Sequence, residues 1–272
     1  MRRAIITFIT LACLCLTGSA QEGYTTITDA AYHPGENAYA DEMCRLDFYC
    51  PADRDCPTVI WFHGGGLVGG SRSAPKEFLD AGFAVAAVSY RFLTGASVEE
   101  IIDDAAAAVA WTFRQVASRG GRTDRIFVAG HSAGGYLTDM VVLDKRYLEK
   151  YGIDADTIAG AFPFSAQVIT HFNVRKEMGL GALQPLIDET APLYHVRALQ
   201  MPLYVMSGDR ELEMNGRYEE QAYFWRMMKL CGSSNVFLYE FQGYDHGGMK
   251  RPALPVTVRH IRSICEGKVP ER

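Results

Sequence analysis

Apolar residues along the chain follow two different spacings. Short and almost continuous apolar runs predict buried strands at residues 58–62, 83–90, 125–129, 158–164, 203–206 and 236–241. Between these runs, apolar positions recur every three or four residues, which predicts helices over 75–80, 98–118, the stretch after 132, 217–230 and 256–265. Strands that alternate with helices favour an α/β fold with a mostly parallel central sheet and helices on both faces.

The N-terminal part of the chain has another pattern. Residues 44–49 alternate apolar and polar side chains, and a weaker alternation covers residues 26–28. Such alternation is typical of strands with one buried face, so we expect an antiparallel N-terminal edge of the sheet. Further along, Ser97 and Glu100 form a capping-box signature at the start of a predicted helix. No repeat or linker divides residues 21–272, which we expect to form one domain.

The first twenty residues form a separate unit. Arg2 and Arg3 precede an apolar run over residues 4–16, and small residues follow at positions 18–20. A run of this length predicts a signal peptide over residues 1–20 and is too short for a permanent membrane span. We therefore expect an exported protein, periplasmic or secreted, with no membrane span after cleavage. A lipoprotein anchor at Cys13 is a less favoured alternative, because it leaves a short apolar region.

Composition limits the classes of partner. The chain has 272 residues, 48% of them hydrophobic, which is enough for one large core. Loss of the first twenty residues removes two arginines and changes the net charge from −5 to −7, so nothing indicates a nucleic-acid partner. The remaining cysteines show no zinc-binding spacing and suggest structural thiols: Cys44, Cys50, Cys56, Cys231 and Cys265. Candidate disulfides are Cys50/Cys56 and Cys231/Cys265, and the odd number leaves at least one thiol unpaired.

One candidate for chemistry lies between a predicted strand and a predicted helix, in the sequence Gly130-His131-Ser132-Ala133-Gly134. A serine in such a turn needs small residues on both sides, or its hydroxyl could not stand clear of the sheet. The free N–H groups at the helix N-terminus point toward negative charge that develops beside the serine. The pattern predicts that Ser132 is a nucleophile; the alternative is an ordinary glycine-rich turn.

A serine nucleophile needs a base and a group that orients the base. His246 follows the last predicted strand in a glycine-rich loop that can bring its imidazole over the serine. Asp209 and Glu211 follow an earlier strand, and either gives the chain order serine, acid, histidine. Asp209 can instead cap the turn or pair with Arg210, so the residues alone leave the acid open.

Acyl transfer also needs donors aimed at a developing oxyanion. The motif His63-Gly64-Gly65-Gly66 follows a predicted central strand. Without side chains, Gly65 and Gly66 let their backbone N–H groups approach a substrate oxygen, and the N–H group of Ala133 is a third candidate donor. The alternative is a plain glycine turn, which is less favoured beside the predicted nucleophile and base.

Residues 167–196 do not fit the alternation of strands and helices. A long insertion beyond the carboxyl ends of the strands would lie over the site that α/β sheets place there. We therefore expect a lid or a pocket wall at about 167–196, the alternative being an ordinary long connection.

Three motifs together resemble the α/β-hydrolase fold: residues 63–66, Gly-His-Ser-Ala-Gly-Gly at 130–135 and Gly-Tyr-Asp-His-Gly-Gly at 243–248. Within that fold, the chain is similar to acetylesterase and hormone-sensitive-lipase-like carboxylesterases, especially their exported bacterial relatives. Residues 46–51 are similar to the Leu-Asp-x-Tyr-x-Pro segment of those relatives, so the resemblance covers nearly all of residues 21–272.

The resemblance implies roles for particular residues. It makes Ser132 the nucleophile and His246 the base, with the oxyanion donors at Gly65, Gly66 and Ala133. The acid of the family commonly follows a strand-closing glycine by three residues, which favours Glu211 over Asp209.

These features predict a serine carboxylesterase that works through an acyl-enzyme and needs no metal or organic cofactor. The resemblance and the expected export suggest short acyl or aryl esters of carbohydrates or small alcohols. The alternatives are a formamidase or peptidase with the same triad, and a catalytically inactive hydrolase-like binding protein.

Overall fold

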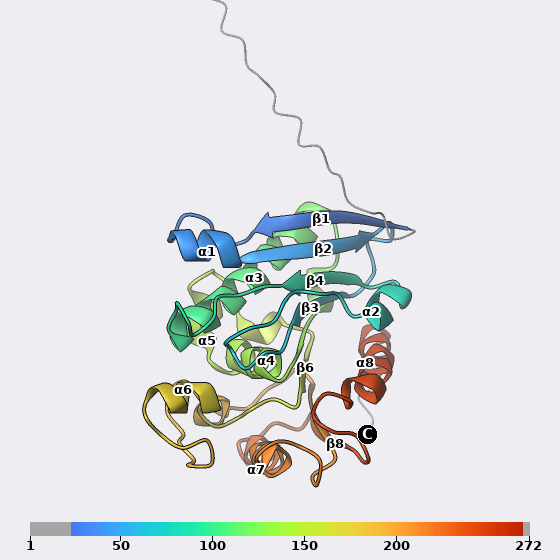
Figure 1. Cartoon of the computed structure of the whole chain (residues 1–272). Coiled ribbons are helices and arrows are strands. Elements are labelled where there is room, and N and C mark those ends of the chain that lie inside the picture. Colours follow the sequence, from blue (N-terminus) through green and yellow to red (C-terminus); the bar gives the residue numbers. More distant parts are fainter. Residues whose placement is uncertain (1–22, 269–272) are drawn as a thin grey trace, which may run out of the picture.

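The computed structural model describes residues 23–268, so the predicted signal peptide lies outside the described residues. One eight-stranded sheet crosses the molecule in the order β1-β2-β4-β3-β5-β6-β7-β8 (Figure 1). The strands are β1 (Tyr24–Ala31), β2 (Arg45–Pro51), β3 (Thr58–Phe62), β4 (Ala84–Val88), β5 (Ile126–His131), β6 (Gly160–Phe164), β7 (Leu203–Gly208) and β8 (Val236–Phe241). β2 runs antiparallel to β1 and β4, whereas β3 to β8 are parallel. The predicted sheet and its antiparallel N-terminal edge are confirmed.

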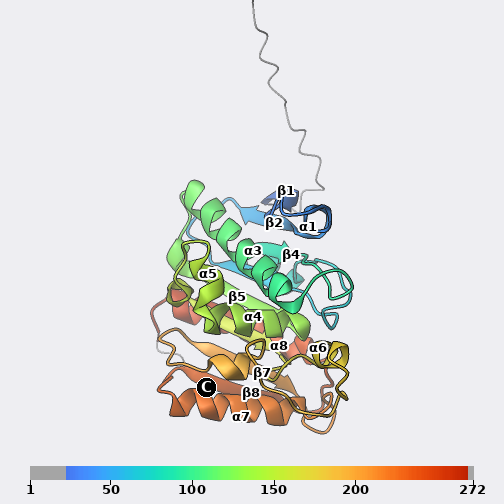
Figure 2. The same ribbon diagram turned by 90° about the vertical axis from the view of Figure 1, so that its left-hand side faces the viewer.

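Helices cover both faces of the sheet. They are α1 (Ala38–Met43), α2 (Lys76–Asp80), α3 (Val98–Ser118), α4 (Ala133–Leu143), α5 (Lys145–Glu149), α6 (Phe172–Glu177), α7 (Arg217–Leu230) and α8 (Lys250–Cys265). α3, α4 and α7 pack on one face, and α2 and α8 pack on the other (Figures 1 and 2). Within residues 23–268, no helix combines the length and apolar character needed to span a bilayer.

The central strands are buried on both faces. All five residues of β3 are buried, and their side chains alternate between the two cores. Ile60 and Phe62 face the core beneath α3 and α4, whereas Val59 and Trp61 face the core beneath α2 and α8. This two-sided burial explains why the parallel strands are continuous apolar runs in the sequence.

Some predicted boundaries hold and others move. α7 has the predicted bounds, and the capping box of α3 forms, with Ser97 N donating to Glu100 Oε2 at 2.7 Å. α8 begins at Lys250, six residues before its predicted start. Pro252 lies in the first turn of α8, where backbone N–H groups have no acceptor within the helix, so it does not prevent an early start. The five cysteines among residues 23–268 are all free, so neither candidate disulfide is formed.

One carboxyl group is buried in this fold without a hydrogen-bond partner among the described residues. Asp139, on α4, is 0% exposed, and neither of its carboxyl oxygens has a hydrogen-bond partner in the described part of the chain. Burial raises the pKa of Asp139 well above its ordinary value, because a charged carboxylate is costly in an apolar surrounding. Asp139 is therefore neutral in the folded protein.

The substitution Asp139→Asn tests this assignment. A carboxyl group with a raised pKa in the folded state stabilises the fold below its unfolded pKa of about 3.9, and this contribution is lost as pH rises. Urea unfolding at about pH 4.5 and about pH 8 should show the Asn variant gaining stability relative to the original chain as pH rises. Identical pH dependence of the two proteins would mean that Asp139 is ionised in the fold.

Candidate active site

Ser132 joins β5 to α4. Its backbone has φ of 57° and ψ of −116°, a conformation that residues other than glycine rarely adopt. A Cβ atom at Gly130 would lie 2.3 Å from the Gly134 carbonyl oxygen, and one at Gly134 would lie 2.1 Å from that of Phe62. The Ser132 N–H group donates to the Phe164 carbonyl at 2.8 Å and so ties the turn to β6. Both glycines are thus sterically required, as their positions in the sequence indicate.

The glycine loop after β3 lies beside this turn. A Cβ atom at Gly65 would lie 1.8 Å from the Gly69 carbonyl oxygen, so the loop cannot form with a side chain there. Each carbonyl oxygen of the loop accepts a hydrogen bond. The Gly64 oxygen accepts from His63 Nδ1 at 2.6 Å, and the Gly65 oxygen accepts from Val68 N at 3.1 Å. The Gly66 oxygen accepts from Asn173 Nδ2 at 2.6 Å. Within residues 23–268, the N–H groups of Gly65 and Gly66 have no protein acceptor and remain available to a ligand.

A histidine and a carboxylate meet at the same edge of the sheet. His246 Nδ1 lies 2.8 Å from Glu213 Oε2, and the Glu213 side chain is 1% exposed. Glu213 Oε1 accepts the Gly208 N–H at 2.9 Å and the Ser165 hydroxyl. Because an ionised carboxylate only accepts, His246 Nδ1 carries the proton and Nε2 is left as an acceptor.

The hydrogen bonds keep Glu213 ionised. Burial alone would raise the pKa of this carboxyl group, but hydrogen bonds from His246 and Ser165, with smaller help from Gly208, hold it at about 2. The charge of Glu213 therefore persists over the whole range in which an esterase would be assayed, and it is available to stabilise a positive imidazolium.

The structure places neither Glu211 nor Asp209, the two predicted acids, against His246. Asp209 caps the turn after β7: its carboxylate accepts from Glu211 N at 2.9 Å and from Gly243 N at 2.7 Å. The Glu213 N–H group donates to the Asp209 carbonyl at 2.9 Å, which closes one helical turn. This turn brings residue 213 back over the end of β7, whereas the side chain of Glu211 is exposed.

His131, the residue before the serine, links the turn to the histidine loop. His131 Nε2 donates to the His246 carbonyl oxygen at 2.7 Å, and the centroids of the two rings are 4.8 Å apart. Burial, and then the charge that His246 can carry, lower the pKa of His131 to about 3, so its ring is neutral. Sequence reasoning gave His131 no separate role, because its contact joins loops that are more than a hundred residues apart.

One open cavity of about 710 Å³ brings these parts together. Ser132 and His246 both line it, as do Gly64, Gly65 and Gly66. Phe172 and Asn173 also line it, and they come from the segment 167–196, which the sequence predicts as a lid or pocket wall. The sequence pattern did not connect three further lining residues with the site, namely Met214, Lys250 and Leu254.

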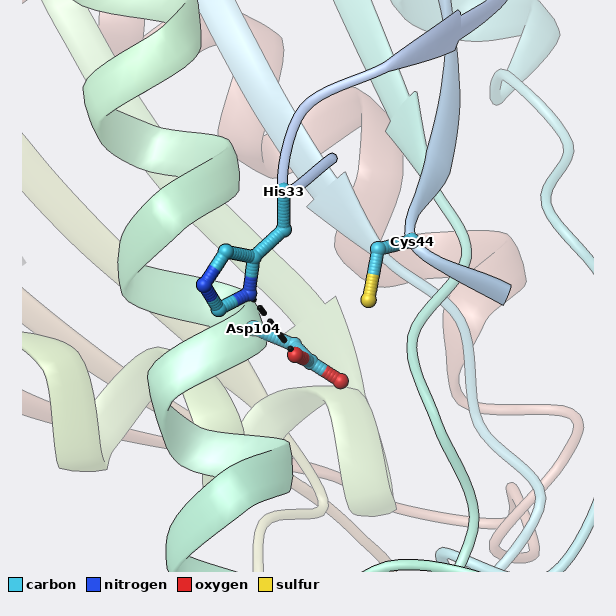
Figure 3. Close-up of side chains that lie close together, drawn as sticks. All are labelled: His33, Cys44 and Asp104. Atoms are coloured by element: carbon cyan, nitrogen blue, oxygen red, sulfur yellow. Dashed lines mark hydrogen bonds and ion pairs between the residues drawn. The ribbon is translucent and has the colours of Figure 1, made fainter. Parts of the chain in front are cut away.

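The described residues also contain a group whose chemistry would suit a metal ion, formed by His33, Cys44 and Asp104 (Figure 3). Asp104 Oδ1 lies 3.3 Å from His33 Nδ1. The guanidinium of Arg91 already donates to both carboxylate oxygens of Asp104. Its Nη2 lies 2.7 Å from Oδ1, and its Nε lies 2.9 Å from Oδ2. A cation would have to displace this guanidinium, so we assign the group a structural role that ties α3 to the N-terminal strands.

The strained serine turn at the carboxyl edge of a mostly parallel sheet, with a histidine loop after the last strand, defines an α/β-hydrolase fold. A solved structure titled "Truncated form of carbohydrate esterase from gut microbiota" has the same fold, with a TM-score of 0.75 at 15% identity over 92% of this chain and 100% of that one. *Thermogutta terrifontis* esterase 2 gives a TM-score of 0.69 at 22% identity over 93% and 98% of the two chains. The chain belongs to the BD-FAE family, whose model matches residues 46–215.

Curated relatives with similar sequences are named as esterases. The probable isoprenylcysteine alpha-carbonyl methylesterase ICMEL1 of *Oryza sativa* subsp. *japonica* is 28% identical over 72% of this chain and 53% of its own length. Esterase LipI of *Mycobacterium tuberculosis* is 28% identical over 55% of this chain and 44% of its own length. The chain thus spans about half the length of the curated relatives it matches.

Exchanging single carboxylates tests which one orients His246. Glu213→Gln keeps the side-chain shape but removes the charge and favours the wrong imidazole tautomer, so kcat for a 4-nitrophenyl ester should fall about 10³–10⁴-fold. The matched control is Glu211→Gln, two residues away and exposed, for which we expect a change of less than about threefold. Equal losses of kcat in the two variants would show that Glu213 is not the residue that orients His246.

Proposed function

We propose that this chain hydrolyses carboxylic esters, with Ser132 as the nucleophile. The observation that carries the proposal is that His246, hydrogen-bonded to the buried Glu213, lines a cavity that the strained Ser132 and the glycine loop also line. The family match and the esterase names of the relatives support the same class of reaction.

The arrangement suits an acyl-enzyme mechanism. Ser132 Oγ attacks the ester carbonyl carbon while His246 Nε2 takes the hydroxyl proton, and Glu213 stabilises the imidazolium that forms. The N–H groups of Gly65 and Gly66, with that of Ala133 at the start of α4, receive the negative oxygen of the tetrahedral intermediate. His246 then gives its proton to the leaving alcohol, and a water molecule, activated by the same ring, releases the acid.

The cavity fits a small ester with a polar part. Ser71, Ser73 and Asn173 offer hydroxyl and amide groups, whereas Trp61 and Phe172 offer aromatic surface. We therefore retain short acyl or aryl esters of carbohydrates or small alcohols as the substrate class. The hydrogen bond from Asn173 Nδ2 to the Gly66 carbonyl supports a role of the segment 167–196 as a pocket wall that braces the glycine loop.

Export is also part of the proposal. The sequence of residues 1–20 has the charged start, apolar centre and small-residue end of a signal peptide, so we infer a periplasmic or secreted enzyme.

Hydrolysis of 4-nitrophenyl acetate tests the proposal. Ser132→Ala should lower kcat by at least about 10³-fold, because it removes the group that forms the acyl-enzyme. The control Ser118→Ala changes an exposed serine at the end of α3 and should keep the original rate. Hydrolysis by the Ser132→Ala variant at the original rate would show that another group carries out the reaction.

A further inference from the structure

Lys250 is the one lysine or arginine among the described residues that line the catalytic cavity. It is the first residue of α8 and is partly exposed. Within residues 23–268, its ammonium group has neither an ion pair nor a hydrogen bond. An ammonium group without a partner at the wall of a cavity is available to a ligand.

The other described residues that line the cavity do not balance this charge. None of them is an aspartate or a glutamate. Glu213, which does not line the cavity, is 1% exposed and already accepts hydrogen bonds from His246 and Gly208. The residues that line the cavity therefore contribute one positive charge and no carboxylate, in a protein whose formal net charge is −5.

The stability of α8 does not explain the position of Lys250. Lys250 and Arg251 are the first two residues of the helix, and its first turn contains no acidic residue. Cations at a helix N-terminus oppose the helix dipole, whereas an anion there is favoured. A negatively charged ligand in the cavity would meet both the Lys250 ammonium and this end of the helix.

The position of Lys250 indicates which part of an ester would carry the charge. Lys250 follows His246 by four residues. Burial lowers the pKa of His131 most, the charge of His246 lowers it further, and the charge of Lys250 makes a smaller contribution in the same direction. Lys250 is therefore close enough to act on the ring that contacts His246. His246 must reach the oxygen of the departing alcohol in order to protonate it. We therefore expect the alcohol portion of a bound ester on the Lys250 side of the cavity and the oxyanion on the glycine-loop side.

We propose that Lys250 is a specificity-determining residue that binds a carboxylate on the alcohol portion of the ester. The substrate class is then an acylated alcohol that carries an acid group, such as an acylated acidic sugar or an acylated hydroxy acid. This inference rests on the proposed esterase function and narrows its substrate.

A matched pair of esters tests the inference. 3-Acetoxybenzoate and 3-acetoxybenzamide have the same acetyl group and nearly the same shape, but only the first carries a negative charge. The measured quantity is the ratio of their kcat/KM values, benzoate over benzamide, obtained from acetate release by four proteins: the original chain and its variants Lys250→Met, Lys250→Arg and Arg251→Met.

We expect Lys250→Met to lower this ratio about threefold to tenfold, mainly through KM, because one partly exposed charge pair is lost. Lys250→Arg should keep the preference for the anion. Arg251→Met removes the neighbouring exposed cation outside the cavity and should leave the ratio close to that of the original chain. Salt at about 0.5 M should reduce the ratio of the original chain toward that of Lys250→Met.

Two results would overturn the inference while leaving the esterase function standing: an unchanged ratio in Lys250→Met, or an equal fall in Arg251→Met. The absence of Ser132-dependent hydrolysis of both esters would instead overturn the proposed function, and this inference with it.

Discussion

The close backbone contact between the end of β3 and the first turn of α4 is the constraint on which the site depends. Gly134 packs so tightly against the Phe62 carbonyl that no side chain fits between them. This contact allows the turn around Ser132 to keep its strained conformation, and it sets the serine beside the glycine loop that continues from β3. The proposed nucleophile and the proposed oxyanion donors are thus positioned by the same pair of neighbouring strands.

His246, the proposed base, reaches this edge from the other half of the sheet, and two sets of contacts hold it there. Glu213 receives hydrogen bonds from His246, Ser165 and Gly208, which compensate for the burial of its charge. The buried Arg217 donates a hydrogen bond to the Ser165 carbonyl and so helps to fix the residue whose hydroxyl binds Glu213. The neutral ring of His131 holds the backbone of His246 directly. Because these groups are engaged before a substrate arrives, the site needs little rearrangement on binding.

The sequence predicts the parts of this molecule whose cause is local. Continuous apolar runs identify the central strands because two-sided burial leaves no position for polar residues, and the glycines of the serine turn are identified because only glycine fits there. Glu213, the carboxylate that pairs with His246, could not be found in this way. The position of Glu213 depends on the helical turn that begins at Asp209. The spacing that is common among relatives selects Glu211, two residues before Glu213. α6 has only six residues, too few to show a helical period, so this helix within the predicted lid or pocket wall could not be predicted from the sequence.

The most direct test is a crystal structure of the protein after reaction with a serine-directed phosphonate ester. We expect a covalent bond from Ser132 Oγ to phosphorus, with the phosphonyl oxygen about 3 Å from the N–H groups of Gly65, Gly66 and Ala133. The hydrogen bond between His246 Nδ1 and Glu213 should be retained. A phosphonate bound to another residue would show that Ser132 is not the nucleophile, and a phosphonyl oxygen that points away from the glycine loop would rule out the proposed oxyanion donors.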